Sequence, residues 1–277
     1  MRRFQPLGDP FPDVTLSYLE QGPAEGEPVL CVHGLTRNAH DFDHLARALA
    51  ERGRRVLAVD MVGRGRSSRL AEPLGYTVEN YARHLARFHA LLGLGPVDWV
   101  GTSMGGLIGI EAAANDLVPI RRLVINDIGP FVPDEALGMI RSYLGLDLRF
   151  ASLEELEAHL RLIHAGFGPL SDADWRNLAR HSAKETPEGW RLSYDPGIRE
   201  AFQAHQGPID VWAAWDKITC PTFVLHGADS PLLTTAVLEE MRERGPKLEV
   251  VSLPGIGHAP ALNTEEQIGI VARWLGA

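Results

Sequence analysis

The segment VDWVGTSMGG, Val97–Gly106, decides how this sequence is interpreted, because it places a single serine on a sharp turn. Its first five residues predict a buried strand, and the stretch that starts at Met104 predicts a helix. Ser103 therefore lies on a strand-to-helix turn, where Gly101 and Gly105 leave room for the crossing backbone. The turn pushes the hydroxyl out of the sheet and places it at the positive end of the helix dipole. We interpret the glycines as a support for a nucleophile; a glycine-rich turn with a capping serine is the alternative.

Strand-like and helical stretches alternate outward from this turn, over the first half of the chain and again near its end. This alternation predicts a mostly parallel sheet with helices on both faces. The expected strands are Val14–Gly22, Pro28–Gly34, Arg55–Gly63, Val97–Gly101, Arg122–Gly129, Cys220–Gly227 and Leu248–Gly255.

The alternation of strands and helices stops after Pro130, and from Phe131 to about Lys217 we find only helical periodicity. We therefore expect a helical cap over residues 131–216, inserted after the sixth strand, and a core domain made of residues 1–130 and 217–277. Aromatic side chains of this block could line an apolar pocket over Ser103 or pack the cap against the core. They are Phe150, Phe167, Trp175, Trp190, Tyr194 and Trp212.

Composition restricts the class of protein. The 277 residues are 45% hydrophobic and carry a formal net charge of -9, which argues against a nucleic-acid partner. Cys31 and Cys220 lie in apolar runs, so we expect buried thiols and no disulfide. No leader or membrane-spanning stretch is expected, so the sequence predicts a cytoplasmic protein without a membrane partner, either a monomer or a homodimer.

A serine nucleophile needs a base, and His258 is the candidate. It lies in LPGIGHAP, a glycine-containing loop that follows a predicted strand. A histidine in such a loop has no evident packing role, although any of the other ten histidines could be purely structural.

Together, His33-Gly34, the GTSMGG turn and the late GHAP motif resemble the α/β-hydrolase superfamily over nearly the whole length of the chain. The resemblance implies an eight-stranded, mostly parallel sheet and a Ser-His-acid triad in the chain order nucleophile, acid, histidine. It also implies that the N–H groups of Leu35 and Met104 form the oxyanion hole, and that helical caps enter where the insertion is expected.

Two carboxylates could orient His258. Asp229 in LHGADSPLL is our first choice, although in the family an acid often stands one position later, where this chain has Ser230. Asp127 in VINDIGP lies at the end of the predicted strand Arg122–Gly129 and is the second choice. Its alternative role is a carboxylate that anchors a loop.

Other motifs are assigned no chemistry. DMVGRGRSS, Asp60–Ser68, resembles a glycine-containing turn of the family and is interpreted as architectural, because it lacks the third glycine of a dinucleotide site. We expect no cofactor and no metal. Arg37 and His40 follow the HG loop and could meet a substrate carboxylate; exposed loop charges are the alternative.

The predicted reaction is the hydrolysis of small to medium carboxylic esters through an acyl-serine intermediate, with a small-molecule ester as partner. A serine at the turn argues against relatives that carry an aspartate nucleophile. A carbon-carbon bond hydrolase, a cofactor-free perhydrolase and a low-turnover ligand receptor remain alternatives.

Overall fold

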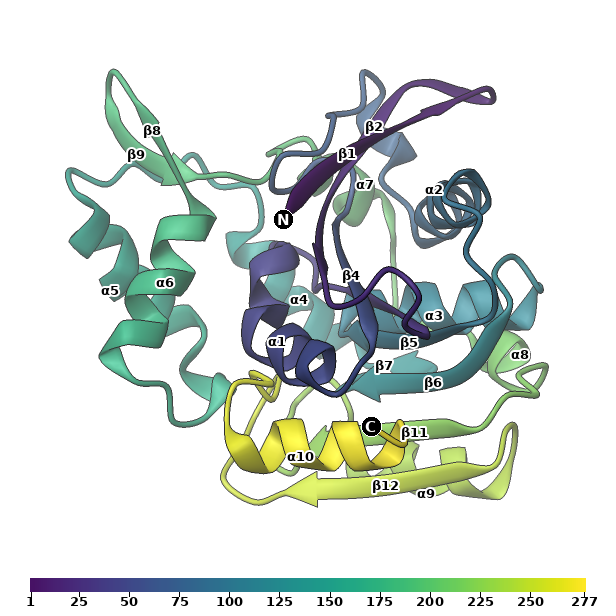
Figure 1. Cartoon of the computed structure of the whole chain (residues 1–277). Coiled ribbons are helices and arrows are strands. Elements are labelled where there is room, and N and C mark those ends of the chain that lie inside the picture. The colour runs from purple at the N-terminus through teal and green to yellow at the C-terminus, as the bar shows by residue number, and fades with distance from the viewer.

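A computed structural model, which describes residues 1–277, contains an eight-stranded sheet in the spatial order β1-β2-β4-β3-β5-β6-β11-β12 (Figure 1). The pairs β1/β2 and β2/β4 are antiparallel, and the other five pairs are parallel. The strands are β1 (Arg2–Gly8), β2 (Phe11–Gln21), β3 (Pro28–Val32), β4 (Arg55–Asp60), β5 (Val97–Thr102), β6 (Ile120–Asn126), β11 (Thr222–Gly227) and β12 (Leu248–Leu253). The predicted fold class is confirmed.

Helices cover both faces of this sheet because each presents an apolar side to it. On one face, α1 and α10 contribute Leu45, Leu49 and Val271 to a buried cluster. On the other face, α2, α3 and α9 contribute Phe88, Ile108 and Leu238 to a larger one. These helices are α1 (Asp43–Glu51), α2 (Val78–Leu91), α3 (Met104–Ala114), α9 (Thr235–Glu243) and α10 (Glu265–Trp274).

The chain leaves the sheet after β6 and returns at β11, so the insertion lies where the sequence predicts it. Two of its helices, α5 and α6, stand to one side of the sheet in Figure 1 and share a small buried cluster that includes Leu160 and Trp175. The insertion contains β7 (Phe131–Val132), α4 (Asp134–Tyr143), α5 (Leu153–Ile163), η3 (Ala165–Phe167), α6 (Asp172–Ser182), β8 (Ala183–Thr186), β9 (Gly189–Leu192), α7 (Ile198–Ala204), β10 (Ile209–Asp210) and α8 (Trp212–Trp215).

The insertion is not purely helical, which corrects the expectation for residues 131–216. β8 and β9 form an antiparallel hairpin, and β7 pairs with β10. Helix α6 ends at Ser182, and the next residues, Ala183–Thr186, form β8 instead of continuing the expected helical periodicity.

Two further observations concern membrane-spanning helices and the two cysteines. None of the helices is both long and apolar enough to cross a lipid bilayer. Cys31 is buried, Cys220 is half-buried, and the two are free thiols.

Candidate active site

Ser103 occupies a strained turn between β5 and α3. Its φ of 52° and ψ of −116° lie outside the regions that ordinary residues favour, and such strain is typical of functional sites. A Cβ on Gly101 would clash with the carbonyl oxygen of Gly105, and a Cβ on Gly105 would clash with that of Val32. Glycine is therefore required on both sides of the serine, as the sequence predicts.

The hydroxyl of Ser103 meets His258 and Asp127 in a continuous chain of hydrogen bonds. Nε2 of His258 lies 2.8 Å from Oγ of Ser103, and Nδ1 lies 2.8 Å from Oδ2 of Asp127. A carboxylate only accepts, so Nδ1 carries the proton and Nε2 is free to accept the proton of the serine. The Asp127 side chain is fully buried, whereas the His258 side chain is 19% exposed.

The geometry corrects our first choice of acid. The side chain of Asp229 is exposed and only its backbone is fixed, by the bond from its amide to the carbonyl of Ile256. Asp127, with a φ of 58°, turns back toward the site, and its Oδ1 accepts from the Gly227 amide at 2.8 Å. The second-choice carboxylate is therefore the one that faces His258.

The segments that carry the two expected oxyanion donors, Leu35 and Met104, both lie next to Ser103. Met104 is the first residue of α3, and a Cβ placed on Gly34, next to Leu35, would lie 3.7 Å from Cβ of Ser103. The expected donors thus belong to two separate segments that approach each other at Ser103.

His33 and Arg64 hold the segment that carries Leu35, a role that the sequence analysis did not assign to them. Nδ1 of His33 donates to the Gly34 carbonyl at 2.7 Å, and Nε2 accepts from the Met61 amide at 2.9 Å. Burial lowers the pKa of His33 to about 4, so the ring is neutral. Nε of the buried Arg64 donates to the Leu35 carbonyl at 2.8 Å.

Asn126 is a second site residue that the sequence did not reveal. It links the segment of Ser103 to the loop of His258. Its amide nitrogen donates to Oγ1 of Thr102 at 3.0 Å and to the carbonyl of Pro260 at 2.8 Å. The backbone carbonyl of Asn126 accepts a hydrogen bond from the backbone N–H of Ser103 at 2.9 Å. The only indication in the sequence is its position at the end of the sixth strand.

A cavity of about 70 Å³ lies between the core and the insertion, and Thr102 and Ala259, the chain neighbours of Ser103 and His258, line it. Its apolar lining includes Phe167, Leu170, Leu178, Ala259 and Pro260. The insertion also touches the histidine loop directly, because the amide of Gly257 donates to the carbonyl of Gly166 at 2.8 Å. Of the aromatic residues considered in the sequence, Phe167 is the one that reaches this cavity.

Arg37 is not an exposed loop charge, which corrects the alternative we gave for it. It is 6% exposed, its Nη2 lies 2.6 Å from Oδ1 of Asp41, and its Nη1 donates to Oγ of Ser182 at 3.0 Å. Arg37 therefore joins the oxyanion segment to the end of α6. Burial lowers the pKa of nearby His164 well below its usual value, and the positive charge of Arg37 lowers it further.

The sheet order, the strained strand-to-helix turn and the insertion after β6 define an α/β hydrolase. The chain belongs to the alpha/beta hydrolase fold family, whose model matches residues 27–263. It is similar to a 3-hydroxybutyrate-oligomer hydrolase of Cupriavidus necator, with 38% identity over 94% of this chain and 92% of the relative. A 2-(acetamidomethylene)succinate hydrolase of Mesorhizobium japonicum is 29% identical over 88% of this chain and 85% of its own.

Solved structures agree with this assignment. An α/β hydrolase from Novosphingobium aromaticivorans is 33% identical and superimposes with a TM-score of 0.88, covering 100% of this chain and 98% of its own. A hydrolase from Rickettsia typhi is also 33% identical, with a TM-score of 0.89 and coverage of 95% and 91%. The protein is thus a hydrolase of this family.

Proposed function

We propose that the protein is a serine hydrolase that cleaves carboxylic esters of small to medium acyl chain through an acyl-serine intermediate. The observation that carries this proposal is the bonded chain from Ser103 through His258 to Asp127. The three side chains come from the ends of β5, β6 and β12, and together they supply a nucleophile, a base and a group that orients the base.

The proposed mechanism has two halves, acylation of Ser103 and hydrolysis of the acyl-serine. Nε2 of His258 takes the proton of Ser103 as the hydroxyl attacks the ester carbonyl, and Asp127 stabilises the imidazolium that forms. The amides of Leu35 and Met104 stabilise the tetrahedral oxyanion. His258 then protonates the leaving alcohol and activates a water molecule that hydrolyses the acyl-serine.

One observation supports a small ester as substrate. The relative from Cupriavidus necator is named for hydrolysis of 3-hydroxybutyrate oligomers, which are short esters of a small hydroxy acid. We propose the insertion, residues 131–216, as the cap that closes over such a substrate.

The test is steady-state hydrolysis of p-nitrophenyl acetate, butyrate and longer esters, together with the linear dimer of 3-hydroxybutyrate. Asp127→Asn should lower kcat by about 10³- to 10⁴-fold, because the histidine is left in the wrong tautomer. Asp229→Asn is the matched control and should retain nearly full activity, since its side chain is exposed.

Other outcomes would contradict the proposal. If Asp229→Asn lost activity and Asp127→Asn stayed normal, the acid of the triad would be Asp229. A halt after about one turnover would indicate a receptor. Faster cleavage of 2-(acetamidomethylene)succinate than of any ester would remove ester hydrolysis as the main reaction.

A further inference from the structure

A second, smaller cavity lies between the insertion and the segment that carries Leu35. Its volume is about 10 Å³, which admits roughly one water-sized group. Thr36, the residue after Leu35, lines it from the core together with Arg37. The polar side chains that line it from the insertion are Tyr143, His159, His164, Ser182 and Tyr194. No aspartate or glutamate lines this cavity.

The wall of this cavity adjoins the reacting side chains. A Cβ placed on Gly34 would lie 3.6 Å from Cγ of Arg37 and 3.7 Å from Cβ of Ser103, so these two side chains flank the same glycine. Burial lowers the pKa of His164 most, and the charges of Arg37 and His258 lower it further because both are close to its ring. The cavity therefore lies near both the nucleophile and the base.

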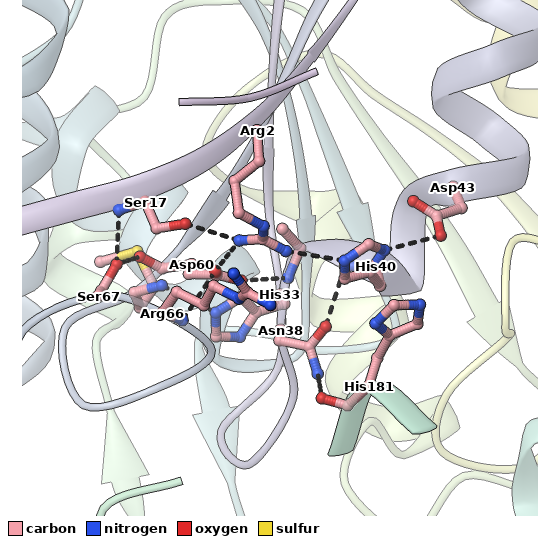
Figure 2. A network of polar contacts seen from close by, with 12 residues as sticks. Arg2, Ser17, His33, Asn38, His40, Asp43, Asp60, Arg66, Ser67 and His181 are labelled. Carbon is pink, nitrogen blue, oxygen red and sulfur yellow. Dashed lines mark hydrogen bonds and ion pairs between the residues drawn. The ribbon is translucent and has the colours of Figure 1, made fainter. Parts of the chain in front are cut away.

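The guanidinium of Arg37 is fixed in place but retains free donors. Asp41 accepts from Nε at 3.0 Å and from Nη2 at 2.6 Å, and Oγ of Ser182 accepts from Nη1 at 3.0 Å. These bonds use three of the five N–H donors of the guanidinium, and the other two have no protein acceptor. The amide nitrogen of Asn38 holds the same end of α6, because it donates to the His181 carbonyl at 3.1 Å (Figure 2).

The ring of His164 is available as an acceptor. Its nitrogens form no hydrogen bond with the protein, and the ring stacks on Phe167 with centroids 4.4 Å apart. The lowered pKa keeps the ring neutral, and a neutral imidazole has one donor and one acceptor nitrogen. Arg37, by contrast, can only donate. The cavity thus has a fixed donor and a free acceptor in its wall.

The electrostatics of the cavity favour a neutral ligand over an anion. The charge of Arg37 is paired with Asp41. α4 ends at Tyr143, α5 at Ile163 and α6 at Ser182, and all three of these last residues line the cavity. The C-terminal end of a helix carries partial negative charge, which disfavours an anion. A hydroxyl group suits the cavity better, because it is neutral, is about the size of a water molecule, and both accepts and donates.

We propose that this cavity binds a hydroxyl group of the substrate, with Arg37 donating to its oxygen and His164 accepting its hydrogen. The substrate class is then an ester that carries a hydroxyl a few bonds from its reacting carbonyl. This inference rests on the proposed ester hydrolysis at Ser103 and narrows its substrate class. An ester without the hydroxyl leaves the buried donor and acceptor unpaired, so it should react more slowly.

The experiment compares matched esters in which a methyl group replaces the hydroxyl. Ethyl 3-hydroxybutyrate and ethyl 3-methylbutyrate differ in the acyl part, and 2-hydroxyethyl butyrate and propyl butyrate differ in the alcohol part. Each kcat/KM is divided by the rate constant for hydrolysis by hydroxide, which removes differences in intrinsic reactivity. In at least one pair the wild type should prefer the hydroxy ester at least about tenfold, and that pair identifies the part of the substrate that enters the cavity.

Two variants test the two assigned side chains. His164→Phe keeps a ring against Phe167 but removes the acceptor, and Arg37→Met removes the donor. Each should bring the preference to within about twofold of one, and a ratio measured within one variant does not depend on the fraction of folded protein. His205→Phe is the matched control, because His205 is an exposed histidine of the same insertion, and it should keep the wild-type preference.

Calorimetric titration of Ser103→Ala with the same esters gives the preference as a ratio of Kd values and needs no turnover. Tighter binding of a hydroxy ester that the wild type does not hydrolyse would refute the proposed hydrolysis and support this cavity. Equal relative kcat/KM or equal Kd values within both pairs would overturn the cavity proposal and leave ester hydrolysis to be judged by the rates themselves. A wild-type preference that persists in either folded variant would also overturn it.

Discussion

Arg64 is a buried cation beside the oxyanion segment, and no carboxylate neutralises it. Besides the Leu35 carbonyl, its guanidinium donates to the Val62 carbonyl at 2.8 Å and to the hydroxyl of Tyr81 at 2.6 Å. The guanidinium also lies 4.9 Å from the centre of the Tyr81 ring. Arg64 is thus a positioning residue that fixes the oxyanion segment and adds positive potential where the oxyanion would form.

We predict that Arg64→Met lowers kcat by about 10- to 10²-fold and leaves KM nearly unchanged, because the loss falls on the transition state. Rates are normalised to active sites titrated with a fluorophosphonate, which separates this effect from partial unfolding. Arg66→Met, on the exposed side of the same loop, is the control. A normal kcat per active site in Arg64→Met would show that Arg64 has a structural role alone.

The acid of the triad shows what can and cannot be predicted at the level of single residues. Ser103 and His258 stand in loops whose glycines leave few other interpretations. Asp127 and Asp229, by contrast, both follow strands, β6 and β11, which are parallel neighbours, so both reach the same edge of the sheet. The direction of each side chain depends on the backbone: Asp127 adopts a positive φ that the sequence does not reveal.

At the scale of elements, the close approach of α3 to β3 depends on a missing side chain. The backbone at Gly105 lies so near the Val32 carbonyl that a Cβ would collide with it, and neither backbone can move without disturbing the sheet. This contact also sets the position of the Ser103 turn. A second helical glycine, Gly138 in α4, has nothing within 4 Å of its would-be Cβ.

We predict opposite effects for the same substitution at these two glycines. Gly105→Ala should lower the free energy of unfolding by about 2 kcal/mol or more, through overpacking. Gly138→Ala should raise it by about 0.5–1 kcal/mol, since alanine favours the helix. Urea unfolding of both variants measures the difference, and equal effects would contradict the packing described for α3.

Elements of the core were predicted well, and those of the insertion less well, for a physical reason. The strands of the core are apolar runs buried on both faces. The hairpin β8–β9 has no fully buried residue, so hydrophobic periodicity does not reveal it.

At the scale of the whole molecule, several buried or half-buried histidines have neutral rings. Burial lowers the pKa of His33, His84 and His181 to about 4, below the usual value of 6.5. The unfolded chain therefore binds protons that the folded chain does not accept between pH 6.5 and 4. Stability from these groups is complete above pH 6.5 and is lost as the pH falls through this window.

His84→Phe isolates one of these contributions. The ring of His84 packs edge-on against Phe11, with centroids 4.5 Å apart, and its Nδ1 has no partner. Phenylalanine retains the packing and cannot be protonated. Between pH 6 and 4.5, the slope of unfolding free energy against pH should fall by about 1 kcal/mol per pH unit in the variant. Denaturant unfolding at several pH values measures it, and identical slopes would show that folding does not shift the pKa of His84.

The most direct test of the account is covalent labelling with a fluorophosphonate, followed by peptide mass spectrometry. A hydroxyl activated by His258 should be modified stoichiometrically, and the adduct should map to Ser103. His258→Ala should slow labelling by at least about 10³-fold, because the base is lost. An adduct on another residue, or equally fast labelling of Ser103 without His258, would contradict the assignment of this site.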